Sequence, residues 1–157
     1  MAITTAVSKE ELQVVIFKLG NEEYCVPVSQ VREIQNYIPP TRIPDTPVFV
    51  EGVINLRGQI IPVIDLKKRF NIGIIEKTPD TCFIVVDMKD ETLGILVDSV
   101  SEVVTLSKEI FEPPPAKVVS SINTSYISGV GKLPNRLLIA LDLEKILSSD
   151  EIEELKQ

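Results

Sequence analysis

Hydrophobic residues in this chain occur mostly in short continuous runs or at every second position, a pattern typical of β-strands. The run Val-Val-Ile-Phe-Lys-Leu predicts a first strand at residues 14–19, followed by a polar turn at 20–23 and a returning strand at 24–28. Further strands are predicted at residues 52–56, 59–66, 82–88, 93–97 and 137–143. We therefore expect a mainly β fold.

Few segments show helical spacing. Ser148 stands three positions before Glu151, which is the spacing of a capping box, and predicts a C-terminal helix over residues 149–156. Apolar residues that recur every three positions predict about one helical turn at residues 29–34. Four prolines predict an extended loop or edge segment: Pro39, Pro40, Pro44 and Pro47.

The chain contains an internal repeat in two blocks. Residues 15–34 align without gaps on residues 84–103, and both copies read apolar strand, polar turn, apolar strand, then V-x-E-[IV]. Residues 52–66 align in the same way on residues 129–143. Two blocks in the same order indicate a duplication into two small β-barrel halves of about five strands each. Halves of this size are small for independent folding, so we expect them to share a central core.

Composition narrows the possible functions. The chain of 157 residues has a formal net charge of −7, which disfavours nucleic acid as a partner. It contains no histidine, which removes Ser-His-Asp and Cys-His catalysis and imidazole metal sites. No nucleotide-binding motif and no apolar run of the roughly 20 residues that span a bilayer is present. We expect a soluble cytoplasmic protein that binds partners, has no cofactor or metal, and is not an enzyme.

Several residues leave more than one interpretation open. Cys25 and Cys82 lie in apolar runs, where buried free thiols are favoured over a disulfide or a reactive pair. Asp65 and Asp142 hold matched repeat positions, which favours capping of the short helix that follows each over catalysis. The basic run at residues 67–69 is interpreted as a solvated helix face, with steering of an acidic partner as the alternative.

A predicted hairpin at residues 52–66 has Arg57 and Gly58 at its tip. Arg57 is either an ordinary solvated turn arginine or an interface anchor. The second repeat has Pro134 and Asn135 in its turn, so the architecture does not demand an arginine there. Arginine is also the charged residue most often used as an interface anchor, because its planar group makes directed hydrogen bonds.

The chain resembles the chemotaxis coupling protein family CheW from about Gln13 to its end. The resemblance rests on the segments at residues 17–34, 41–70 and 93–104, and above all on the pattern G-V-x-N-L-R-G-x-I-x-P-x-x-D-L at residues 52–66. It implies a single CheW-like domain over residues 1–157 with two five-stranded OB-like or SH3-like barrels that exchange strands. Approximate halves are residues 20–80, and residues 1–19 together with 81–147.

The resemblance also implies a function: a non-enzymatic adaptor that couples chemoreceptors (methyl-accepting chemotaxis proteins) to the histidine kinase CheA. Its implied partners are the receptors' cytoplasmic hairpin and the kinase's C-terminal regulatory domain, so it reaches the membrane only through receptor arrays. The implied receptor-binding residues are Val31, Glu33, Gly52, Asn55, Arg57 and Gly58. The implied kinase-binding residues are Ile34, Arg42, Ile43, Pro44 and Pro47.

The alternative function is an OB-type module that binds a ligand or nucleic acid. Such a module reads single strands with a basic groove and stacking aromatic residues. Here aromatic residues make up only 5% of the chain and the net charge is negative, so the adaptor is favoured.

Overall fold

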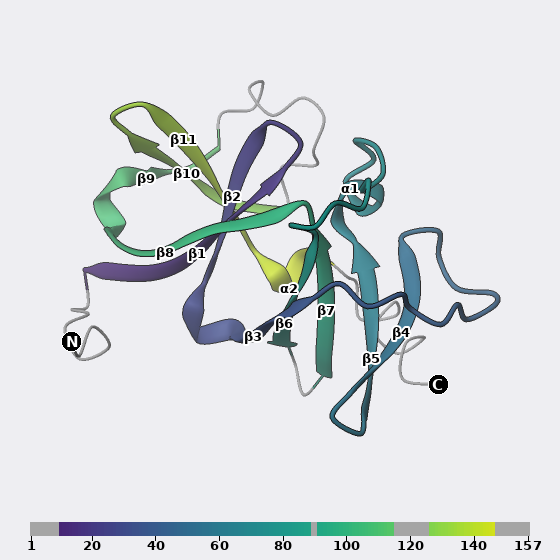
Figure 1. Ribbon diagram of the computed structural model, residues 1–157. Helices are drawn as coiled ribbons and strands as arrows, with labels where there is room; N and C mark the ends of the chain where they lie inside the picture. The colour runs from purple at the N-terminus through teal and green to yellow at the C-terminus, as the bar shows by residue number, and fades with distance from the viewer. Residues whose placement is uncertain (1–9, 89–90, 115–125, 147–157) are drawn as a thin grey trace.

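The computed structural model describes residues 10–88, 91–114 and 126–146, and it confirms the mainly β prediction (Figure 1). Sheet A has the strand order β8-β1-β2-β11-β10-β9 and sheet B the order β3-β6-β7-β5-β4. Sheet A comprises β1 (Glu11–Leu19), β2 (Glu22–Pro27), β8 (Ser99–Ser107), β9 (Phe111–Glu112), β10 (Ile127–Leu133) and β11 (Arg136–Leu141). Sheet B comprises β3 (Val31–Asn36), β4 (Val50–Leu56), β5 (Gln59–Asp65), β6 (Cys82–Met88) and β7 (Glu91–Val97).

The helices within the described residues are short. They are α1 (Leu66–Arg69), α2 (Leu143–Ile146) and the 3-10 turns η2 (Val28–Gln30) and η3 (Lys108–Ile110). None of the helices in this part of the chain is long and apolar enough to cross a membrane. The predicted C-terminal helix at residues 149–156 lies outside the described residues.

The duplication is visible in the strand pairing. Strands β1, β2, β3 and β5 of the first repeat correspond to β6, β7, β8 and β11 of the second. The antiparallel pair β3–β6 corresponds to the antiparallel pair β8–β1, and the parallel pair β5–β7 corresponds to the parallel pair β11–β2. A register shift between Val50 and Gly52 has its counterpart between Ile127 and Gly129, at the same displacement as the sequence repeat. The structure therefore confirms the predicted duplication down to the register of its strands.

The strands are divided between the sheets differently from the expected halves. The β1–β2 hairpin stays whole in sheet A and the β6–β7 hairpin stays whole in sheet B, whereas the expected boundaries near residues 20 and 80 assigned them otherwise. A short turn keeps adjacent antiparallel strands paired, so the exchange occurs after each hairpin. The chain crosses from sheet A to sheet B at η2 and returns at Asp98, between β7 and β8.

The predicted helical turn at residues 29–34 is mostly strand. Only η2 is helical, and β3 begins at Val31. Residues 31–36 alternate between half-buried and exposed, and they pair with β6. Sheet pairing with a period of two thus outweighs the recurrence of apolar residues at every third position.

The two halves share a core, as the small size of each half led us to expect. One cluster of buried side chains draws on β1, β2, β10 and β11 of sheet A together with β4 to β7 of sheet B, α1 and α2. Strand β1 is buried on both faces, because Val15 and Phe17 enter this shared cluster while Val14 and Ile16 pack in a second cluster within sheet A. Burial on both faces explains why the strand is a continuous apolar run rather than an alternating one.

Asp65 and Asp142 cap short helices, as predicted. The Asp65 carboxylate accepts hydrogen bonds from the backbone N–H of Lys68 and of Ile75, both at 3.2 Å. The Asp142 carboxylate accepts one from the N–H of Glu144 at 3.1 Å. Burial raises the pKa of Asp65 above its ordinary value, although these N–H donors act in the opposite direction.

The two cysteines are buried free thiols, in agreement with the favoured interpretation. Burial raises the pKa of the Cys25 thiol to about 12 and also raises the pKa of Cys82. Because the thiolate is the reactive form, both side chains are poor nucleophiles at neutral pH.

Candidate partner-binding surface

The hairpin between β4 and β5 ends in a two-residue turn formed by Arg57 and Gly58. Both have positive φ angles, 52° and 88°, as a type I′ turn requires. The Asn55 side-chain oxygen accepts the Gly58 N–H at 2.8 Å and so holds the turn. Asparagine, aspartate or glycine is favoured at the first position of such a turn. Arginine at this position therefore makes the turn less stable than a favoured residue would.

The curvature of sheet B brings Arg57 to Glu33. Their strands, β4 and β3, are at opposite edges of the sheet, yet the Arg57 guanidinium forms an ion pair with the Glu33 carboxylate. The Arg57 side chain remains 70% exposed and that of Glu33 21% exposed. Nearby, Arg32 of the edge strand β3 donates to the side chain of Gln59, the first residue of β5, at 3.0 Å. These polar contacts close the barrel and present Arg57 to solvent.

Gly52 and Val31 contribute differently from the exposed members of the predicted receptor-binding set. Gly52 is buried, its φ is 138°, and a Cβ built on it would lie 2.1 Å from the backbone oxygen of Thr41. Thr41 and Val53 exchange two backbone hydrogen bonds at this point. The close approach that Gly52 permits is therefore to its own chain. Val31 is half-buried against the shared core.

The predicted kinase-binding residues lie on β3 and on the loop that follows it. Ile34 is 42% exposed and Ile43 is 38% exposed, so both present apolar side chains to solvent. Arg42 and Pro44 are exposed and Pro47 is half-buried. Consecutive strand residues point to opposite faces, so Glu33 and Ile34 point away from each other on β3. The two predicted sets thus use different faces of this strand.

Among the described residues of the second half, no ion pair corresponds to that between Arg57 and Glu33. Its hairpin turn carries Pro134, and Glu102, the counterpart of Glu33, is bound instead by Arg136 at 3.0 Å. Arg136 also makes two parallel hydrogen bonds to Glu23, at 2.8 and 3.0 Å. The two halves share a fold but present different charges.

Exposed apolar residues, by contrast, recur in both halves. Ile60 is 61% exposed and its counterpart Leu137 is 54% exposed, and Val103, the counterpart of Ile34, is 50% exposed. Ile60 and Leu137 lie in continuous apolar runs, so nothing in the local pattern predicts that they face solvent. Each half therefore presents exposed apolar side chains at corresponding positions.

The basic run at residues 67–69 is not the solvated helix face that was expected. All three side chains are half-buried in α1. Lys67 pairs with Asp98 at 3.1 Å and Lys68 with Glu51 at 2.7 Å, while Arg69 lies against aromatic rings. All three charged side chains bind partners within the molecule, because α1 packs at the junction of the two halves.

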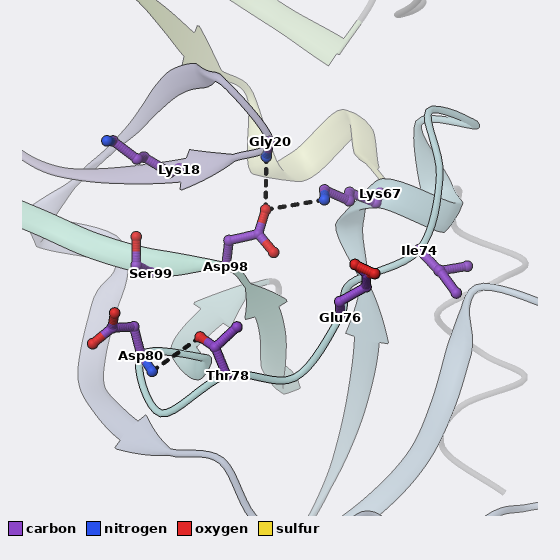
Figure 2. Close-up of a pocket in the computed structure, with 9 residues that line it drawn as sticks. All are labelled: Lys18, Gly20, Lys67, Ile74, Glu76, Thr78, Asp80, Asp98 and Ser99. Carbon is purple, nitrogen blue, oxygen red and sulfur yellow. Dashed lines mark hydrogen bonds and ion pairs between the residues drawn. The ribbon is translucent and has the colours of Figure 1, made fainter.

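A cavity of about 370 Å³ lies at this junction (Figure 2). Figure 2 shows the Asp98 carboxylate between the Gly20 N–H and Lys67, and Glu76 and Asp80 also line the cavity. In the described part of the chain, no cluster of three or more histidine, cysteine or acidic residues could hold a metal ion.

Comparisons with known proteins point in one direction. The model of the CheW-like domain family matches residues 13–151. The chain is 44% identical over 137 residues to chemotaxis protein CheW of Klebsiella aerogenes, covering 87% of this chain and 82% of that protein. It is 36% identical over 157 residues to chemotaxis protein CheW of Treponema pallidum, covering 98% and 92%. The crystal structure of scaffolding protein TtCheW from Thermoanaerobacter tengcongensis superposes with a TM-score of 0.82 and 38% identity, covering 92% of each chain.

Proposed function

This chain belongs to the CheW-like family and has the role of a scaffold in chemotaxis, and we propose that it joins chemoreceptors to the histidine kinase CheA. The exposed Arg57 at a turn position that does not favour arginine is the observation that carries the receptor half of this proposal. An exposed arginine that costs local stability is expected where a partner uses it.

The receptor's cytoplasmic hairpin would contact the tip of the β4–β5 hairpin. Arg57 offers up to five donors in a planar group, and its ion pair with Glu33 holds this group in one place. Glu33, Asn55 and Gly58 surround it on β3 and the hairpin, whereas Gly52 and Val31 support the surface from beneath.

The kinase's regulatory domain would dock on Ile34, Ile43 and the proline-rich loop. Ile34 on β3 and Ile43 in the loop are exposed, as are Arg42 and Pro44, and Pro47 is half-buried; this mixture of apolar and polar side chains is of the kind found at protein interfaces. Ile34 points to the opposite face of β3 from Glu33, which would leave room for both partners on one molecule at once.

The adaptor would act without catalysis and as a single domain. The absence of histidine from the chain leaves no usual base at neutral pH, and the shared core supports joint folding of the two sheets. Recruitment to the membrane would come through the receptors, with the protein itself in the cytoplasm.

Titration of the purified chain with each partner tests this proposal. We expect saturable binding both to a soluble fragment of the receptor hairpin and to the isolated kinase regulatory domain. Ile34→Asp should weaken kinase binding by about tenfold or more, because it places a charge in an apolar contact. Ile74→Asp is the matched control, since Ile74 is 61% exposed and belongs to neither predicted set. If the chain fails to bind one or both of these partners, the adaptor function is contradicted.

A further inference from the structure

Helix α1 lies where the two halves meet, and its first basic residue reaches across the junction. The Lys67 ammonium contacts the Asp98 carboxylate at 3.1 Å, and the same carboxylate oxygen accepts the Gly20 N–H at 2.6 Å (Figure 2). Gly20 is in the β1–β2 turn of sheet A, and Asp98 is the residue at which the chain crosses from β7 to β8. Lys67, which follows β5 of sheet B, is thereby tied to sheet A.

Arg69 makes a second connection between the halves. Its guanidinium carbon lies 4.6 Å from the ring centroid of Phe49, before β4 of sheet B, and 5.2 Å from that of Tyr126, before β10 of sheet A. Its Nε donates a hydrogen bond to the backbone oxygen of Ile146 at the end of α2. Cation–π contacts of this kind are favourable, more so when the cation is partly removed from water.

The duplication gives this contact a special position. Phe49 and Tyr126 are counterparts in the two repeats, and the backbone oxygen of each accepts a hydrogen bond from the backbone N–H of the capping aspartate of its own half, at 2.8 Å in both. Ile146 is likewise the counterpart of Arg69, so corresponding points of the two halves meet at this arginine. Only one copy of the repeat carries the charged side chain.

The residue between them, Lys68, stays within its own half. It pairs with Glu51 on β4, which is in sheet B like the strand that precedes α1. Its side chain is 24% exposed, close to the 16% of Lys67. Lys68 therefore differs from its neighbours in what it connects rather than in burial.

We propose that Lys67 and Arg69 are positioning residues that fix the angle between the two sheets and so hold the partner-binding surfaces in a set arrangement. Two connections from one short helix, one to Asp98 beside the β1–β2 turn and one to Tyr126 and Ile146, restrict rotation of one half relative to the other. The effect on partners rests on the proposed function, whereas the effect on the angle does not.

The angle can be measured as a distance between two spin labels. Asn36 at the end of β3 and Thr105 on β8 are exposed, one in each sheet, and can be replaced by labelled cysteines. The native cysteines are buried and disfavour the thiolate, so they should not take up the label. Pulsed electron spin resonance then gives the distribution of distances between the sheets.

We expect Lys67→Met and Arg69→Met to broaden or shift this distribution, and the double variant to do so most. Lys68→Met should leave it as in the wild type, and cooperative melting should show that each variant is folded. If Arg69→Met does not fold, Lys67→Met still provides the test, because Lys67 and Asp98 line the cavity and are not part of the buried core.

A double variant with the wild-type distribution, or an equal broadening by Lys68→Met, would overturn the proposal. In the same samples, we expect the double variant to lose simultaneous capture of receptor fragment and kinase domain by about tenfold. If the wild-type chain binds neither partner while the distances respond as expected, the positioning role stands and the adaptor function fails.

Discussion

Arg57→Ala should weaken binding of the receptor's cytoplasmic hairpin about thirtyfold or more while leaving the melting curve almost unchanged. Loss of an arginine that anchors an interface costs about 2 kcal/mol or more of binding free energy, which gives this factor. Folding should tolerate the change, because Arg57 is 70% exposed and exposed ion pairs add little to stability. Isothermal titration and thermal melting measure the two effects. Binding to the isolated kinase domain should suffer less.

Arg57→Asn is the sharper variant, because it separates the turn from the interface. It creates the Asn-Gly pair that a type I′ turn favours, so the melting temperature should stay the same or rise while receptor binding falls. Lys132→Ala is the matched control: Lys132 is 65% exposed and is ion-paired with Glu112 in the other half. Receptor binding that is unchanged in Arg57→Asn, or a loss of several kcal/mol of stability in Arg57→Ala, would show that Arg57 is a structural turn residue and not an interface anchor.

Gly52→Ala should destabilise the fold by about 3–5 kcal/mol. The new Cβ would lie 2.1 Å from the backbone oxygen of Thr41, which is fixed by its hydrogen bonds to Val53, and alanine rarely adopts the φ of 138° found there. Overpacking and backbone strain each cost about 1–3 kcal/mol, and here they add at one residue. Chemical denaturation followed by circular dichroism measures the free energy of unfolding.

The duplication supplies the control for this variant. Gly129 is the counterpart of Gly52, but its Cβ would lie 3.1 Å from the backbone oxygen of Glu112 and its φ is not in the positive range. Gly129→Ala should therefore cost clearly less than Gly52→Ala. Equal losses would show that the contact with Thr41 does not set the requirement for glycine. If Gly52→Ala is the more destabilising variant, a larger substitution at Gly52 should abolish partner binding by unfolding the protein, not by removing a direct contact.

The sequence predicted best those elements whose pattern one local rule decides. The buried strand β6 was predicted with its observed bounds, because a short continuous apolar run between polar segments is typical of a buried strand. The repeat predicted the duplication, and the equivalent antiparallel pairs β1–β8 and β3–β6 agree with it. Strand β8 was not predicted, because most of its residues are exposed and its apolar pattern is therefore weak.

What the sequence could not predict depends on contacts between the halves. The boundary of each half follows from where the chain crosses between sheets, at η2 and Asp98, and no local pattern marks these points. Likewise, Arg69 reads as one more charge in a basic run, and its place between Phe49 and Tyr126 becomes visible only once the sheets are packed. The pairing of Glu33 with Arg57 similarly required the curvature of sheet B, although both residues had been singled out.

Co-sedimentation with receptor-bearing vesicles tests the central claim most directly, because an adaptor must hold both partners at once. Vesicles that contain chemoreceptors are mixed with the kinase in the presence or absence of this protein, and the kinase in the pellet is quantified. We predict that the kinase sediments with the vesicles only when the protein is present, and that Arg57→Asn reduces the amount recovered. Kinase recovery that does not depend on the protein, or a pellet that contains the protein without additional kinase, would contradict the account.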